Sequence, residues 1–521
     1  MLTDFRDPTA REHYDADICI VGSGAAGIAM ALRLSTTRHR VCLLESGGFE
    51  LEPEIQALYE AESIGQERAS PLSCRLRYFG GTTNHWQGWC APLEARDFEK
   101  RTWVRYSGWP IKKADLDPFY AAAQELLELG EYRYEADELQ ERDPTLAAID
   151  PKRAVVRYWQ YSPPTRFGTV YREPLRRARN VEVVLHANAV KLHTDAEARA
   201  IQRIDIQNLL GRQGTVRARA YVLACGGMEN ARLLLQTNDV KPQGLGNQSG
   251  ALGRFFMQHP ERKVASIVTD DGDGLLAAFG RRNSEVGWIR AHLACSTRLQ
   301  RELGLLNAGF DVLPYQEYGT GYQALRGIAN DAGAGQWPAD LDTRVWSVLS
   351  DLDGLAGDVY RRVRGEVSAF NLIVHAEQTP NPDSRIWLTN DRDRLGLPKL
   401  KVDWRLSRED KRAIVESTLL IGHELGRLKL GRLKLEDWLL SEEADWPENI
   451  WSGCHQMGTT RMSDDINQGV VDRNARVHGV RNLYLAGSSV FPTGGYVPPT
   501  LTIVALALRL VDHLHSGGAD D

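Results

Sequence analysis

Three glycines near the N-terminus have the spacing of a phosphate-binding turn. The stretch "GSGAAG" places Gly22, Gly24 and Gly27 in the pattern GxGxxG. The first glycine permits the tight turn, the second lets a pyrophosphate approach the backbone, and the third lets a helix pack closely on a strand. Glu45 follows 18 residues after Gly27, where its carboxylate can accept hydrogen bonds from ribose hydroxyls. The pattern predicts a dinucleotide site that includes Gly22, Gly24, Ala25, Ala26, Gly27, Glu45 and Ser46.

The residues around this motif predict the elements that position it. "DICIVG" reads as a buried strand, "GIAMALRLS" has helical spacing, and "RVCLLESGG" reads as a second strand ending in the acid. Such a βαβ unit requires a parallel sheet. Strand, glycine turn and helix recur at 216–236, and a strand and glycine turn at 482–493 are followed by another helix. We therefore expect an α/β fold with a Rossmann-like nucleotide domain assembled from separate segments.

The intervening segments differ in character and predict a second domain. They contain a helix at "DLDPFYAAAQELLELG", strands at "SRIWLTN" and "LKVDWRL", and an amphipathic helix at "REDKRAIVESTLLIGHELGRL". We predict a nucleotide-binding domain from 1–90, 176–264 and 445–521, and an α+β substrate-binding domain from 91–175 and 265–444. An interrupted domain can enclose a large, permanently held cofactor, which favours FAD, although the glycine motif alone also permits an NAD(P)-linked reductase.

Composition excludes several other classes of protein. The chain has 521 residues, a net charge of −6 and 25% charged residues, which disfavours a nucleic-acid partner. It lacks both a run of about 18 apolar residues and an apolar N-terminal signal, which predicts a cytoplasmic protein without a membrane span. The seven cysteines include no CxxC pair. That pattern predicts reduced thiols and no metal or iron–sulfur site.

Several motifs together resemble the glucose–methanol–choline (GMC) oxidoreductases over nearly the whole chain. They are "GSGAAG…LLESGG", "YFGGTTNHW" (78–86), "YVLACGGMENARLLL", "GRFFMQHP" (253–260), "GCHQMGTTRM" (453–462) and "NLYLAGSSVFPTGGYVPPTLTIVALALRL". Within that family, "GGTTNHW" and "HQMGTTRM" look most similar to pyranose oxidases and bacterial FAD sugar dehydrogenases.

The resemblance implies an FAD-dependent oxidation of an alcohol, first of all a sugar or glycoside hydroxyl, to the carbonyl. Hydride would pass to flavin N5 while His455 takes the hydroxyl proton, a role that suits a side chain titrating near neutral pH. Pyranose oxidases attach FAD through a histidine matching His85, but here we expect a non-covalent contact. The resemblance adds to the cofactor site Gly81, Thr82, Asn84, His85, Trp86, Val190, Ala224, Gly487, Ser488, Pro499, Thr500 and Leu501.

The last helix begins without a capping side chain. Pro499 suits a first helical position, but Pro498 before it has no acceptor group. The resemblance implies that the free N–H groups of this helix face the pyrimidine end of the flavin. Relatives commonly carry Asn or His where this chain has Pro498. We therefore predict a site with a single histidine, with a substrate-domain group as the alternative partner.

The remaining predictions concern side chains and partners outside these motifs. His259 is interpreted as a structural turn residue, and Trp103, Trp109 and Trp159 as core rather than sugar-stacking residues. The expected partners are a small-molecule alcohol and an electron acceptor that is oxygen, a quinone or a partner protein. Two alternatives stay open: oxidation of an aryl or antibiotic-like alcohol, and a flavin-holding lyase without redox activity. The sequence makes no prediction of oligomeric state.

Overall fold

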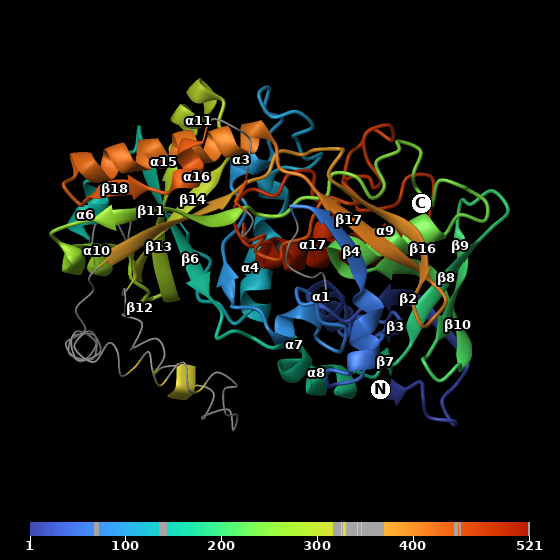
Figure 1. Ribbon diagram of the computed structural model, residues 1–521. Helices are drawn as coiled ribbons and strands as arrows, with labels where there is room; N and C mark the ends of the chain where they lie inside the picture. Colours follow the sequence, from blue (N-terminus) through green and yellow to red (C-terminus); the bar gives the residue numbers. More distant parts are fainter. Residues whose placement is uncertain are drawn as a thin grey trace.

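Within the described part of the chain, two large β-sheets and one small sheet form the frame (Figure 1). The computed structural model describes residues 1–66, 72–134, 143–315, 369–441, 446–447 and 450–518, with a few single positions between 325 and 348. In the view of Figure 1, sheet 1 lies on the right, sheet 2 on the left, and helix α17 between them.

Sheet 1 has the parallel core that the sequence predicts. Its strands run in the order β1 (Leu2–Asp4), β7 (Val181–Leu185), β3 (Val41–Leu44), β2 (His13–Val21), β10 (Gln213–Leu223), β9 (Ile201–Gln207) and β8 (Asn188–Thr194), with β19 (Leu483–Leu485) also paired to β10. The strands from β1 to β10, and β19, are parallel, whereas β9 and β8 are antiparallel. All four residues of β3, "VCLL", are buried, as expected for a parallel strand covered on both faces.

The three predicted strand–turn–helix units meet in this sheet. Helix α1 (Ala25–Leu34) follows β2, α9 (Gly226–Gln236) follows β10, and α17 (Thr500–His513) follows β19. Strand ends are in register, with Val21 beside Leu223 and Leu223 beside Leu485. Ligands of open α/β sheets bind at such a carboxyl edge. At Gly27, an added Cβ would lie 1.9 Å from the Gly22 carbonyl oxygen, so only glycine lets α1 pack on its turn.

Sheet 2 is antiparallel and supports the other side of the interior. Its order is β18 (Arg432–Leu435), β11 (Glu261–Val268), β15 (Ala369–Ala376), β14 (Ala308–Tyr315), β13 (Gly287–Cys295), β6 (Ala154–Tyr161) and β5 (Trp89–Cys90), with β12 (Arg282–Ser284) beside β13. Helix α15 (Arg408–Arg427) packs on this sheet, and Ser407 caps it through a hydrogen bond from the Asp410 N–H.

The third sheet joins distant parts of the chain. It consists of β16 (Arg385–Arg392), β17 (Pro398–Trp404) and β4 (Ala61–Gly65). The other α-helices of the described residues are α2 (Pro53–Gln56), α3 (Ala95–Phe98), α4 (Asp117–Leu126), α6 (Pro144–Ala147), α7 (Phe167–Val170), α8 (Arg172–Arg177), α10 (Gly272–Phe279), α11 (Thr297–Leu303) and α16 (Asp437–Leu440). Helix α17 packs against both α1 and α4, which makes it a central helix of the molecule (Figure 1).

Sheet 1 corresponds to the predicted nucleotide-binding segments. Every strand of sheet 1 comes from the segments predicted to bind the nucleotide, whereas β4 and β5 from the same segments join sheets 3 and 2. The domain boundaries themselves stay a prediction.

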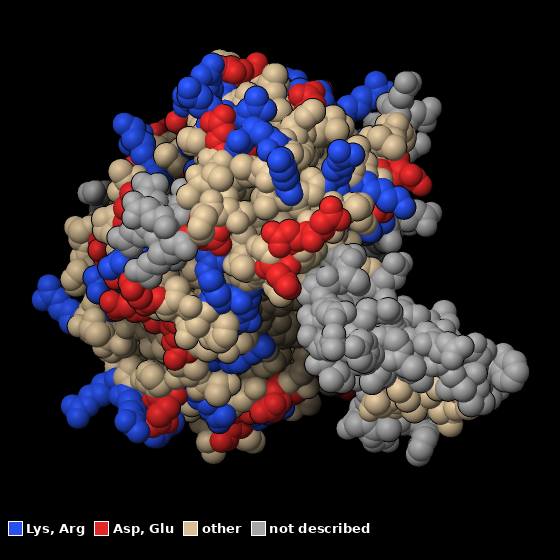
Figure 2. Space-filling view, turned by 90° about the vertical axis from the view of Figure 1, so that its left-hand side faces the viewer, with Lys and Arg blue, Asp and Glu red and all other residues tan. Residues whose placement is uncertain are grey.

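Acidic and basic side chains are interspersed over the described part of the face in Figure 2. Among the described residues, no helix combines the length and apolarity needed to cross a bilayer.

Candidate active site

The carboxyl ends of the parallel strands open onto a cavity of about 800 Å³. Its wall takes residues from the turns after β2, β10 and β19, and from β11, β14 and β15 of sheet 2. This volume lies in the usual range of small-molecule and cofactor sites. One cavity therefore connects the nucleotide-binding sheet with the second sheet.

The start of α1 forms one end of the cavity and suits a pyrophosphate. Helix α1 has no side-chain cap, and a Cβ added at Gly24 would meet nothing within 4 Å. The Glu45 carboxylate lies beside this turn and accepts hydrogen bonds from the Ser23 N–H (3.0 Å), the Ser23 hydroxyl (2.6 Å) and the Gly47 N–H (3.1 Å). Free N–H groups at a helix start bind phosphates, so this end fits a dinucleotide.

The start of α17 forms a second uncapped helix end on the same wall. The helix begins at Thr500, one residue later than predicted, with Pro499 in the cap position and no capping side chain. Pro498, Pro499, Thr500 and Ile503 line the cavity. The N–H groups and the positive end of the helix dipole there suit an anionic part of a ligand.

Most of the predicted cofactor residues lie on this wall, and four do not. Those on the wall are Gly22, Gly24, Ala25, Ala26, Glu45, Ser46, Gly81, Thr82, His85, Trp86, Ala224, Gly487, Ser488, Pro499 and Thr500. Gly27 is instead packed against the Gly22 carbonyl, and the Asn84 side chain donates to the Phe79 carbonyl (2.9 Å). The Val190 carbonyl accepts from Gln236 (3.2 Å), and Leu501 is buried in the core.

His85 and Trp86 follow a short 3₁₀ turn at Gly81–Asn84. The pKa of His85 lies below its ordinary value because the ring is partly buried and the Arg166 guanidinium is near. Trp86 is fixed by a hydrogen bond from its Nε1 to the Thr165 carbonyl (2.9 Å). Both side chains line the cavity, so they can contact a flavin without a covalent bond.

The predicted base, His455, is half-buried on the same wall. Burial is the main cause that places its pKa well below the ordinary value, with His259 and His375 acting in the same direction. The ring is therefore neutral near neutral pH, which is the form a base requires. His259 is buried, and its Nδ1 lies 2.9 Å from Nδ1 of His455, a contact that the interpretation of His259 as a structural turn residue did not include.

A buried charge cluster on sheet 2 was not predicted. Strand β15 holds His375 between Glu261 of β11, paired with its Nδ1, and Asp311 of β14, 3.2 Å from its Nε2. Burial alone would lower the pKa of His375, but the two carboxylates raise it to about 10. His375 and Glu261 line the cavity. Cross-strand pairing over such distances leaves no local signal in the sequence.

A second buried ion cluster lies near the nucleotide end. Arg75 Nη1 is 2.8 Å from Glu229, and the Arg75 guanidinium lies over the Tyr59 ring. Although Glu229 is buried, Arg232, Arg75 and Arg77 lower its pKa to about 2. Arg75, Arg77 and Glu229 all line the cavity. The letters "RLR" before "YFGG" were the available signal for the two arginines.

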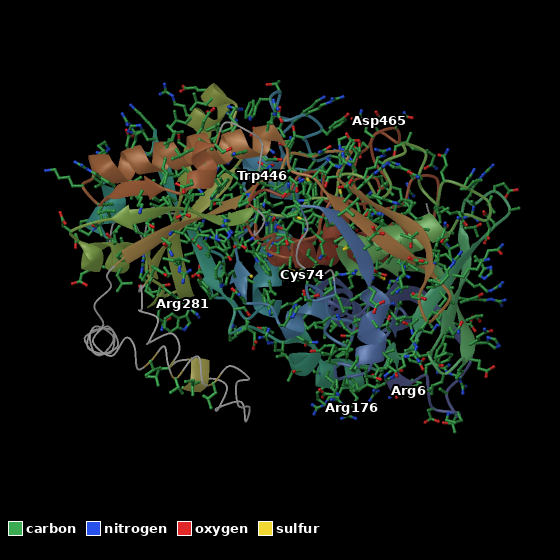
Figure 3. The ribbon with its side chains drawn as sticks, in the orientation of Figure 1. Arg6, Cys74, Arg176, Arg281, Trp446 and Asp465 are labelled. Carbon is green, nitrogen blue, oxygen red and sulfur yellow. A yellow bond between two sulfur atoms is a disulfide. The ribbon has the colours of Figure 1, made fainter. Side chains whose placement is uncertain are left out.

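Two cysteines of the cavity wall are joined. Cys74 and Cys454 form a disulfide with a Cα–Cα distance of 5.3 Å across 380 residues of sequence. Figure 3 shows Cys74 near the centre of the molecule. The prediction that all seven cysteines are reduced thiols was therefore wrong for these two, and the cysteine pattern gives no argument for a reducing compartment.

Aromatic and aliphatic side chains complete the wall near sheet 2. They are Trp89, Trp451, Leu313 and Ile373. Trp103, Trp109 and Trp159 do not line the cavity; Trp109 and Trp159 are buried, and Trp103 donates from Nε1 to the Leu305 carbonyl (3.0 Å). Within the described part of the chain, no group of three or more His, Cys, Asp or Glu side chains is arranged to hold a metal ion.

Comparisons with known proteins agree with this geometry. The family model "FAD dependent oxidoreductase" matches residues 17–278, just over half of the chain, and the model "GMC oxidoreductase" matches residues 380–507. The chain is 24% identical to 2-methyl-1,2-propanediol dehydrogenase of Mycolicibacterium austroafricanum, over 96% of this chain and 95% of the relative. It is also 24% identical to paromamine 6'-oxidase of Streptomyces fradiae, over 96% and 93%.

Solved structures share the fold. The crystal structure of pyridoxine 4-oxidase from Mesorbium loti superposes with a TM-score of 0.57 at 18% identity, covering 96% of this chain and 99% of that one. A formate oxidase structure gives a TM-score of 0.56 at 16% identity, covering 98% of this chain and 100% of that one. The two family models, together with the cavity they span, show that this chain belongs to the FAD-dependent GMC oxidoreductases.

Proposed function

We propose that the protein oxidises a hydroxyl group of a sugar or glycoside to the carbonyl, with FAD as the cofactor and His455 as the base. One observation carries the proposal: a single cavity joins the α1 turn, the Glu45 carboxylate, the free end of α17 and the neutral ring of His455. The first three suit a dinucleotide, and the last suits removal of a hydroxyl proton.

Each end of the cavity has a distinct task in this proposal. Glu45 and the α1 turn hold the adenosine ribose and the pyrophosphate, and His85 and Trp86 contact the ring system. When bound, FAD supplies the acceptor for the hydride that leaves the hydroxyl-bearing carbon. The uncapped start of α17, with Pro499 and Thr500, stabilises negative charge at the cofactor by its N–H groups and dipole. His455 accepts the proton of the substrate hydroxyl.

His455 acts as a single base in this proposal. Pro498 lines the cavity but has no group that could hold the substrate hydroxyl. Among the cavity residues that sheet 2 contributes, the titratable side chains are Glu261 and His375, and these two are paired with each other. Their charges are thus directed at one another, so neither is arranged as a second base.

The proposed substrate class is based on the aromatic residues of the cavity wall and on the name of a relative. Trp89 and Trp451 offer aromatic faces on which the C–H faces of a sugar can stack. The fructose dehydrogenase large subunit of Gluconobacter japonicus, a relative 25% identical over 64% of this chain, belongs by its name to an enzyme of a sugar. Aryl or antibiotic-like alcohols are the second candidates. Electrons then leave to oxygen, a quinone or a partner protein.

Anaerobic flavin reduction tests the proposal directly. Purified protein should be yellow, and a panel of sugars, glycosides and aryl alcohols should contain a compound that bleaches the flavin. His455→Ala should keep FAD but slow that reduction by about 100-fold or more, the usual scale for a positioned base. Near-normal reduction in this variant would remove His455 from the mechanism. A flavin that stays oxidised while a substrate is cleaved would identify a lyase instead.

A further inference from the structure

Two histidines from distant segments face each other at the cavity: His455 lines it, and His259 lies beside His455. Met257 and Met457 form an antiparallel pair, with N–H to carbonyl hydrogen bonds of 3.0 and 2.9 Å in the two directions. His259 lies two residues after Met257 and His455 two residues before Met457, so an antiparallel register places the two histidines opposite each other. Their Nδ1 atoms are 2.9 Å apart, and the ring planes meet at 74°.

The surroundings of His259 determine where the protons of the pair lie. His259 Nε2 is 3.4 Å from the Gly494 carbonyl oxygen, which can only accept, so Nε2 carries the proton of this ring. Because burial lowers the pKa of His259 to about 4, the ring holds one proton near neutral pH. Its Nδ1 is then a bare lone pair, and only a donor can approach it at hydrogen-bond distance.

We infer that His259 is a positioning residue that fixes His455 in the tautomer with a proton on Nδ1. This inference rests on the proposed role of His455 as the base. The Nδ1–H of His455 donates to His259, which leaves Nε2 of His455 with the lone pair that takes the substrate proton. The hydrogen bond made by one ring nitrogen thus decides which nitrogen is the base.

The same contact stabilises the product of proton transfer. The substrate O–H bond breaks and an Nε2–H bond forms, so His455 becomes an imidazolium at the half-buried cavity wall. Its Nδ1–H continues to donate to His259, and a hydrogen bond from a charged donor is stronger than a neutral one. The charged groups near the pair, His375, Glu261 and Glu377, come from sheet 2 and the segment after β15.

The backbone beside His455 is shaped for this contact. Gly453 has a φ of +61°, and a Cβ added there would lie 2.8 Å from His455 Nδ1. A side chain at position 453 would therefore occupy the space that the Nδ1–H of His455 needs in order to reach His259.

Two substitutions of His259 separate its two hydrogen bonds. In His259→Asn, the amide oxygen lies near the former Nδ1 and can still accept from His455. In His259→Gln, the amide group lies near the former Nε2 and can still donate to Gly494, but no acceptor faces His455. We expect anaerobic flavin reduction within about threefold of wild type for His259→Asn, and about 10- to 100-fold slower for His259→Gln, with unchanged FAD content. A residue needed only for its hydrogen bond to Gly494 would tolerate Gln better than Asn, so equal losses in the two variants, or a larger loss in His259→Asn, would overturn the inference.

A second measurement does not depend on turnover. With ¹⁵N-labelled histidine in the FAD-loaded protein near neutral pH, the His455 ring should show a directly bonded proton on Nδ1 and none on Nε2. The signal is identified by its absence in His455→Asn. The reverse tautomer would overturn the inference even if His259→Gln fails to fold. Failure of the proposed function would appear separately, as normal flavin reduction in His455→Ala.

Discussion

The charge on His375 should make the stability of the protein depend on pH in a specific window. The ring lies between the Glu261 and Asp311 carboxylates, which raise its pKa to about 10, whereas a histidine of the unfolded chain titrates near 6.5. A raised pKa means that the folded protein binds this proton more tightly. The stabilisation is complete below pH 6.5 and is lost as the pH rises through about 10.

The size of the effect follows from the two pKa values. Between pH 7 and pH 9 the folded state keeps the proton and the unfolded state does not. The free energy of unfolding therefore falls by nearly the one-proton limit of about 1.4 kcal/mol per pH unit. The free energy of unfolding should decrease over this interval by about 2.5 kcal/mol more than in a variant without the histidine. Groups that His375 does not contact titrate alike in both proteins, so the difference reports this residue together with the carboxylates that it pairs with.

Urea unfolding at pH 7 and pH 9 measures this quantity. Wild type should lose about 2.5 kcal/mol more than His375→Gln between the two pH values. Glu261→Gln keeps the imidazole but removes one carboxylate, so its loss should be intermediate. Equal changes in all three proteins would show that His375 is not held in its charged form, and the account of the cluster would fail.

Three further predictions concern the cofactor end and the cross-link. Glu45→Ala should yield protein depleted in FAD, and wild-type FAD content in that variant would contradict the ribose assignment. Acid precipitation should leave flavin in the supernatant, whereas flavin in the pellet would mean a covalent bond at His85. A thiol reductant should lower the stability of wild type by up to about 4 kcal/mol, since the Cys74–Cys454 bridge closes a very long loop, and should leave Cys74→Ser/Cys454→Ser unchanged. A wild type insensitive to the reductant would contradict this.

The sequence could predict the features that depend on local spacing. The GxGxxG turn, the acid at position 45 and the uncapped last helix each follow from a few adjacent residues, and the structure brings all three to one cavity. Local spacing is sufficient there because a strand, a turn and a helix constrain one another within about 30 residues. The parallel sheet follows from the same units.

The sequence was less informative wherever a contact joins distant strands. The Glu261–His375–Asp311 cluster depends on the order of strands in sheet 2, which no short motif specifies. Asn84 belongs to a quoted motif, yet its side chain supports the Phe79 backbone instead of facing the cavity. The pairing of His259 with His455 did have a signal. The letters "MQH" at 257–259 and "HQM" at 455–457 are mirror images, as an antiparallel pair requires if like residues are to face each other.

The position of His455 depends on two other parts of the chain, one at Cys74 and one at Met257–His259. The disulfide to Cys74 holds Cys454, the residue before His455. Met257 pairs with Met457, two residues after His455, and the His259 ring contacts the His455 ring. The backbone at Cys454 has a φ of +57°, a left-handed conformation that costs a non-glycine residue about 1–2 kcal/mol. Such a conformation persists only where the surroundings determine it from several sides, and it is concentrated at functional sites. The side chain that we propose as the base is therefore held in place before any substrate arrives, and the proposed proton transfer requires no reorganisation of the loop that carries it.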